Sequence, residues 1–173
     1  CLYFIFKKDE IFFYIISFAY FIRVFVLLIG YYFYPLPDSL WDSRAIEYYA
    51  NFNSSLPINM VFTFDDTFFP MFQNLLSMIY KVSGRSPLVL LVLINLMSIM
   101  SIIIISKSAF KIWNSRSAQI KCLILLSILP INILYSSVIL RESIILLIMC
   151  MSIYMIINFV ETKKHYFAYL SII

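Results

Sequence analysis

Acidic side chains are the residues of this sequence with the clearest capacity for chemistry. The chain has only nine Asp and Glu residues, and most lie in one polar stretch or directly after Arg141: Asp38, Asp42, Glu47, Asp65, Asp66 and Glu142. Carboxylates that meet in a fold can act as a general base or hold a divalent cation. These positions are therefore the first candidates for a catalytic site.

Each carboxylate also has a purely structural explanation. Asp42 follows Ser39 near the expected start of a helix, where an acidic residue caps the chain and complements the helix dipole. Asp66 can cap a second helix, and Glu47 can pair with Arg44 one helical turn away, a surface contact of small worth. Both explanations stay open for these residues.

Glu142 is a sharper candidate, because it follows Arg141 in a short turn between two long apolar runs. A turn does not require an Arg-Glu pair, and the structural alternative is an ion pair at a membrane surface. Arg23 interrupts an apolar run and must face the interior of a helix bundle. It either has a function or hydrogen-bonds to neighbouring carbonyl groups.

Other chemical motifs are missing from the sequence. The cysteines Cys1, Cys122 and Cys150 have no partner at metal or disulfide spacing, and His165 stands alone beside two lysines. Neither a glycine-rich phosphate loop nor a serine nucleophile elbow occurs, and we predict no protein-ligated metal centre beyond a possible divalent cation at the carboxylates. Asn95 and Asn132 are expected to hydrogen-bond between helices.

Composition indicates a membrane protein. Apolar residues make up 63% of the chain and charged residues 13%, against about 45–50% and 25% in soluble domains. Disorder, a secreted disulfide framework and nucleic-acid binding fit this composition poorly. The net charge of +4 does not indicate nucleic-acid binding, because the basic residues lie in short loops between apolar runs. The bilayer is the expected surrounding.

Crossing a bilayer takes roughly 20 apolar helical residues. The expected spans are 11–33, 86–106, 122–140 with Pro130 near its middle, 143–160, and a fifth that begins at about Tyr166. The fold class is therefore all-α, a polytopic bundle forming one domain over 1–173. Because the chain opens at Cys1 and stops within the fifth apolar run, we expect a fragment of a longer protein.

The distribution of Lys and Arg predicts the orientation. One set of loops holds Lys7, Lys8, Lys107, Lys111, Arg116, Lys121, Lys163 and Lys164, and the other holds Arg44, Lys81, Arg85 and Arg141. The loops with more Lys and Arg are expected to be cytoplasmic. The protein then lies in the cytoplasmic (inner) membrane with its N-terminus in the cytoplasm. Residues 35–85 and the Arg141-Glu142 turn then face outward.

The outer loop 35–85 is expected to hold two amphipathic helices. Trp41, Ala45, Tyr48 and Phe52 recur at helical spacing, which predicts a helix that lies along the membrane surface with this aromatic face in the interface. A second helix is predicted after Asp65-Asp66-Thr67, with Pro70 in its first turn and Gly84 at its end.

Several motifs in this order resemble a known family. They are Pro37-Asp38-Ser39, Asp42-Ser43, Tyr48-Tyr49-Ala50, Phe69-Pro70, Gly84-Arg85-Ser86-Pro87, Asn95, Leu129-Pro130-Ile131-Asn132 and Leu140-Arg141-Glu142-Ser143. The arrangement resembles the N-terminal part of bacterial GT-C-type glycosyltransferases, the membrane enzymes related to protein O-mannosyltransferases and to the aminoarabinose transferases of lipid A.

The resemblance implies a polyprenyl-phosphate-linked sugar donor and transfer on the outer face. By position, Asp42 or Asp38 matches the family's first acidic residue, and Glu142 matches the second. Arg141 and Arg44 are then the expected phosphate-binding residues. The family pattern Asp-x-x-x-Tyr is changed here, because Ile46 stands in the tyrosine position and the tyrosines are displaced to Tyr48 and Tyr49, which are expected to bind substrate.

Three other functions fit the sequence less well. An envelope polysaccharide polymerase of the O-antigen type is expected to have an arginine-rich outer loop, whereas this loop is acidic. A transporter or flippase places polar groups and broken helices at mid-membrane, and the candidates here are Arg23, Asn95, Asn132 and Pro130. A membrane scaffold would leave the outer carboxylates without a role.

Overall fold

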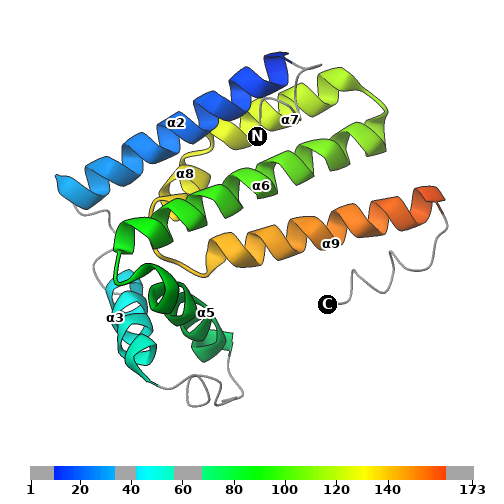
Figure 1. Cartoon of the computed structure of the whole chain (residues 1–173). Helices are drawn as coiled ribbons and strands as arrows, with labels where there is room; N and C mark the ends of the chain where they lie inside the picture. Colours follow the sequence, from blue (N-terminus) through cyan, green and yellow to red (C-terminus); the bar gives the residue numbers. More distant parts are fainter. Residues whose placement is uncertain (1–9, 34–41, 57–67, 163–173) are drawn as a thin grey trace.

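The computed structural model describes residues 10–33, 42–56 and 68–162, and this part of the chain is entirely α-helical. Its seven helices are α2 (Glu10–Tyr32), α3 (Asp42–Ser55), α5 (Phe68–Ser83), α6 (Pro87–Trp113), α7 (Arg116–Ile128), α8 (Pro130–Ser136) and α9 (Glu142–Thr162) (Figure 1). Three of them, α2, α6 and α9, are long and apolar enough to cross a membrane, and α7 with α8 is a fourth if the bent pair counts as one span. The predicted all-α class is confirmed, and the long helices support a multi-pass membrane protein. The fifth predicted span lies outside the described residues.

Helix α6 is the centre of the bundle. It packs against α2, α7 and α9, and Figure 1 shows it between α2 and α9. It begins with Pro87 in its first turn and continues to Trp113, two turns beyond the predicted end at Ser106. No helix-breaking residue intervenes before Asn114, whose left-handed φ of 44° ends the helix.

The third predicted span is not one continuous helix, because it is bent at the predicted proline. α7 ends at Ile128, α8 runs from Pro130 to Ser136 with a bend of 61° between them, and residues 137–141 are not helical. Proline lacks the amide N–H for the helix ladder and restricts the residue before it. Leu129 accordingly has a ψ of 116°, outside the helical region.

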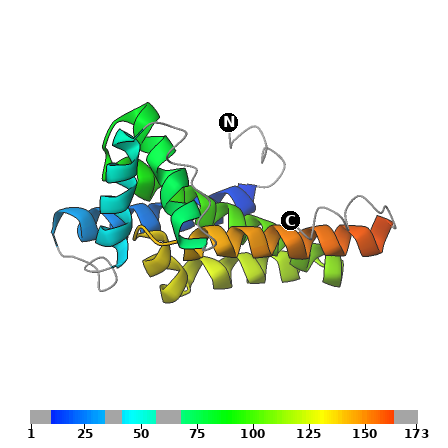
Figure 2. The ribbon, with the colours of Figure 1, turned by 90° about the horizontal axis from the view of Figure 1, so that it is seen from below.

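The two helices predicted between the first and second spans are confirmed as α3 and α5. Pro70 lies in the first turn of α5, and Gly84 with φ +74° ends that helix, as predicted. The pair is antiparallel, because Glu47 contacts Tyr80 while Asn53, later in α3, bonds Asn74, earlier in α5. In Figure 2, α7 and α9 run lengthwise and α3 stands across them.

The buried apolar side chains form two clusters at different depths. The hairpin cluster joins α3 and α5 to the near ends of the long helices and comprises Leu27, Ile46, Ala50, Phe72, Leu76, Tyr80, Leu90, Leu91, Ile94, Val138, Ile139 and Leu140. The bundle cluster lies between α2, α6 and α7 and comprises Phe12, Ile16, Ala19, Ile99, Ile102 and Leu123. The hairpin is thus packed on one end of the bundle, which we call the hairpin end.

Candidate functional site

The first turn of α3 is fixed to the segment that precedes Arg141. Ser43 is buried, and its Oγ accepts a hydrogen bond of 3.2 Å from the backbone N–H of Ile139. Asp42, the first residue of α3, therefore belongs to the same end of the molecule as the 137–141 segment. Asp38, the alternative acidic residue, lies outside the described residues, as do Asp65 and Asp66.

Glu142 is the first residue of α9 and directly follows that segment. Its Oε1 lies 3.8 Å from Nε of Arg141, and both side chains are about two-fifths exposed, at 41% for Arg141 and 42% for Glu142. The second carboxylate oxygen, Oε2, is buried and has no hydrogen-bond partner among the residues that the structure describes. One oxygen of this carboxylate therefore points inward at the hairpin end.

The other predicted binding residues lie on the exposed face of α3. Arg44, Tyr48 and Tyr49 are all exposed, and the two tyrosine rings meet edge to face with centroids 5.7 Å apart. Ile46 and Ala50 form the opposite, buried face. The structure joins the start of α3 to Ile139, two residues before Arg141, whereas Tyr48 and Tyr49 lie on the exposed face of α3.

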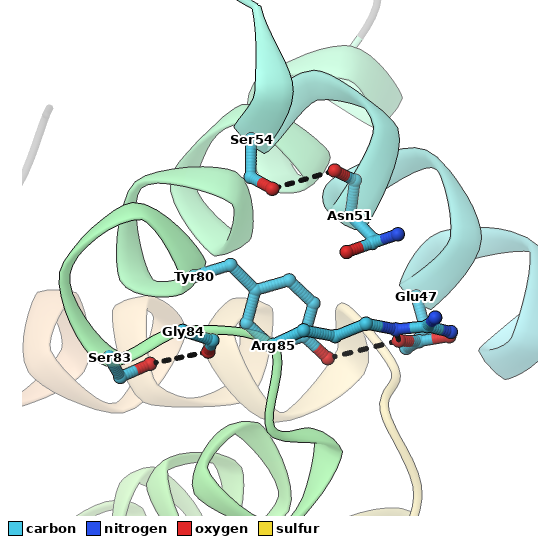
Figure 3. A network of polar contacts seen from close by, with 7 residues as sticks. All are labelled: Glu47, Asn51, Ser54, Tyr80, Ser83, Gly84 and Arg85. Carbon is cyan, nitrogen blue, oxygen red and sulfur yellow. Dashed lines mark hydrogen bonds and ion pairs between the residues drawn. The ribbon is translucent and has the colours of Figure 1, made fainter.

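Glu47 is engaged by residues that follow or end α5, rather than by Arg44. Its Oε1 accepts hydrogen bonds from the Tyr80 hydroxyl at 3.3 Å and from Arg85 Nε at 3.2 Å (Figure 3). Burial, together with the neighbouring carboxylate, raises the pKa of Tyr80 above its usual range. The hydrogen bond to Glu47 raises the pKa of Arg85 as well. This network joins α3 to the turn after α5.

Sequence reasoning missed the Glu47–Arg85 pair because the partners are separated by 38 positions. The signal that could have found it is the antiparallel arrangement of two consecutive helices. In such a hairpin, a residue near the start of α3 lies opposite the end of α5, where Gly84 turns the chain.

Arg23 hydrogen-bonds to backbone carbonyl groups, which is one of the two explanations that its position in an apolar run allowed. Its side chain is 0% exposed and donates to the carbonyl oxygens of Ala19 at 3.0 Å, Ser127 at 3.2 Å and Leu126 at 3.3 Å. The last two belong to the end of α7, whose carbonyls lack helical partners because of the break. The backbone carbonyl of Arg23 also accepts from Ser137 Oγ at 3.4 Å. Arg23 of α2 therefore contacts the chain both before and after α8.

A metal centre is not evident in the described part of the chain, where no three His, Cys, Asp or Glu side chains come close enough to hold an ion. Cys122 and Cys150 are free thiols. No protein-family model, no curated protein and no solved structure matches this chain.

Proposed function

We propose that the protein is a membrane glycosyltransferase that moves a sugar from a polyprenyl-phosphate donor to an acceptor on the outer face of the cytoplasmic membrane. The observation that carries this proposal is the hydrogen bond between Ser43 Oγ and the N–H of Ile139. It joins the start of α3 to the segment before Arg141 and Glu142. The two carboxylates singled out by the resemblance, Asp42 and Glu142, thus begin two helices at one end of the molecule.

The position of this end suits a lipid-linked donor. The excess of Lys and Arg in the opposite loops supports an outer position for the hairpin end. A polyprenyl tail can then lie in the bilayer beside α2, α6 and α9 while its phosphate reaches the start of α3. The exposed aromatic side chains of α3 face the same interface.

The proposed reaction is a displacement at the anomeric carbon of the donor sugar. Asp42 accepts the proton of the acceptor hydroxyl, whose oxygen forms the new bond to the anomeric carbon. The bond from that carbon to the phosphate oxygen breaks, and the lipid phosphate leaves with the electron pair. Arg141 and Arg44 supply positive charge for the leaving phosphate, and the N-termini of α3 and α9 add the positive ends of two helix dipoles.

Glu142 acts as the second acidic residue of this site. Its buried Oε2 has no hydrogen-bond donor among the described residues, so it can accept one from a bound sugar or acceptor hydroxyl.

The test is sugar transfer by the intact protein in membrane vesicles, supplied with a polyprenyl-phosphate sugar that carries a radiolabel. We expect Asp42→Asn and Glu142→Gln each to lower the transfer rate about 10²-fold or more, the usual contribution of a positioned acid or base. Glu161→Gln is the matched control, because Glu161 is an exposed carboxylate at the opposite end of α9.

Each variant is compared at equal amounts of membrane-inserted protein. Normal transfer by both the Asp42 and the Glu142 variants would end this proposal.

A transporter is the second candidate, supported by the break between α7 and α8. In transporters, the carbonyl groups at such a break bind the coupling ion. Here the Leu126 and Ser127 carbonyls accept hydrogen bonds from Arg23 instead. The guanidinium of Arg23 thus occupies the position that a coupling ion takes in a transporter. For this reason we rank the transporter below the transferase.

A further inference from the structure

Two buried side chains in the bundle have polar atoms without hydrogen-bond partners. Asn95 in α6 is 0% exposed, and neither its Nδ2 nor its Oδ1 has a partner in the described part of the chain. Arg23 in α2 is also 0% exposed, and its Nε lacks a partner although its other nitrogens donate to carbonyls. Buried polar groups in proteins are nearly always satisfied, by protein atoms or by ordered water.

The two side chains lie in one layer between the hairpin cluster and the bundle cluster. In α2, Arg23 stands one turn from Ala19, which belongs to the bundle cluster, and one turn from Leu27, which belongs to the hairpin cluster. In α6, Asn95 stands four residues from Ile99 of the bundle cluster and next to Ile94 of the hairpin cluster.

The helical register places each of the two side chains on a helix face that also carries bundle-cluster residues. Asn95 shares a face of α6 with Ile99 and Ile102, since residues four and seven apart stack on one face. Ile99 and Ile102 share the bundle cluster with Ala19 of α2, and Arg23 is on the same face of α2 as Ala19. Because α2 and α6 are in contact, this register is the basis for assigning the unsatisfied atoms of Arg23 and Asn95 to one site.

Nearby serine hydroxyl groups already have acceptors within their own helices. Ser127 Oγ donates to the Leu123 carbonyl at 2.7 Å, and Ser136 Oγ donates to the Ile133 carbonyl at 2.9 Å. An apolar side chain cannot satisfy an amide. A single partner shared by the two side chains would have to accept one hydrogen bond and donate another, because Arg23 Nε is a donor whereas Asn95 Oδ1 is an acceptor.

We propose that Arg23 and Asn95 form an internal water-binding site between α2 and α6. Water is the small molecule that meets this requirement, since it can accept from Arg23 Nε and donate to Asn95 Oδ1 at once. An inorganic anion would accept from the two donors but repel the amide oxygen. A polar site with two or more partners is also the kind that holds ordered water in proteins. This inference does not depend on the proposed transferase activity.

The test compares Asn95→Thr and Asn95→Val, which have nearly the same shape and differ in one hydroxyl group. Thermal unfolding of the purified protein in detergent is followed with a thiol-reactive fluorescent dye, for which Cys150 is a built-in reporter because it is 2% exposed in the folded state. If Asn95 binds water, the native protein melts highest, the threonine variant next and the valine variant lowest.

A dry site gives a different order. If the Asn95 amide is buried without any partner, it lowers the stability of the folded protein, and Asn95→Val removes this destabilisation. The valine variant then melts at or above the native temperature, which would overturn the proposal. A threonine variant that melts no higher than the valine variant would overturn it too. Ser101→Ala is the control: Ser101 is equally buried on α6, but its Oγ donates to the Met97 carbonyl at 2.9 Å, so we expect little change.

Discussion

At the scale of single residues, Tyr80 makes the stability of the folded protein depend on pH. The side chain is 3% exposed within the hairpin cluster, and its hydroxyl donates to the Glu47 carboxylate. Burial and the adjacent negative charge both oppose ionisation of the phenol, so the pKa of Tyr80 is raised in the folded protein. Folding and proton binding at this hydroxyl are therefore linked.

The sign of this linkage leads to a prediction for alkaline pH. An unfolded tyrosine titrates near about pH 10, while the folded one keeps its proton to higher pH. Its contribution to stability is complete below about pH 10 and is lost as the pH rises further. We expect the melting temperature of the native protein to fall more steeply between about pH 9.5 and 11 than that of Tyr80→Phe.

The comparison of the two melting curves removes the contribution of the other tyrosines and lysines. Parallel curves across this range would show that the Tyr80 phenol is not shifted. At neutral pH the phenylalanine variant should lose about 1 kcal/mol, the usual worth of one hydrogen bond.

The residue types at the hairpin end could be found in the sequence, but their partners could not. Asp42 and Glu142 stood out because carboxylates are rare in so apolar a chain, and Arg141 stood out as a neighbour. The contact that brings the two segments together is made by Ser43, an inconspicuous residue that bonds a backbone group 96 positions away. Serine bonds so many backbone groups that its type predicts no particular partner.

At the scale of elements, the break between α7 and α8 depends on two separate features. Pro130 removes one helical hydrogen bond and restricts Leu129. The guanidinium of Arg23 then satisfies carbonyl groups at the end of α7, where a positive charge also complements the helix dipole. In an apolar surrounding, a carbonyl without a donor is costly.

Removing this guanidinium should therefore destabilise the bundle. We expect Arg23→Met to lower the free energy of unfolding by about 1–3 kcal/mol for each carbonyl left without a donor. Arg23→Lys should fall between the native protein and the methionine variant, because an ammonium can still donate to a carbonyl. The measurement is unfolding in a denaturing detergent, followed by circular dichroism.

Lys121→Met serves as the control, since Lys121 is an exposed cation on α7. An Arg23→Met variant as stable as this control would contradict the role that we assign to Arg23.

Local signals predicted the surface helices better than the third span. The periodic apolar residues, Pro70 and Gly84 act within a few positions, and α3 and α5 formed where they indicated. Pro130 was visible as well, but a proline inside a span is compatible with a mild kink or with a complete break. The donor for the carbonyl groups at the break is Arg23, more than a hundred positions away. No local sequence pattern predicts this contact.

At the scale of the whole molecule, the fold is a membrane bundle with an amphipathic hairpin on one end. The hairpin cluster is continuous from α3 and α5 into α2, α6 and the 138–140 segment, so the hairpin is part of the same core and not a separate unit. At the other end, Lys111 of α6 forms an ion pair with Glu161 of α9. The long apolar helices α2, α6 and α9 lie where apolar length predicted spans, whereas the central place of α6 required the structure.

The predicted orientation can be measured with a matched pair of cysteines. Ser55 at the end of α3 and Ser117 at the start of α7 are both exposed and lie at opposite ends of the bundle. In a background with Cys1, Cys122 and Cys150 changed to serine, we expect Ser55→Cys to react with a membrane-impermeant maleimide in intact cells. Ser117→Cys should react only after the cells are permeabilised, and the reverse pattern would invert the topology.

The short length of α7 has a consequence for the lipids around the protein. The 27 residues of α6 extend about 40 Å, whereas the 13 residues of α7 extend about 20 Å before the bend. The length of α6 alone therefore exceeds a bilayer core of about 30 Å, whereas α7 needs α8 and the segment after it to cross. We expect the acyl chains beside the bend to be less regularly packed than those beside α6, at a cost of fractions of a kcal/mol per Å of mismatch. We expect the bilayer to be thinner beside α8 than beside α6.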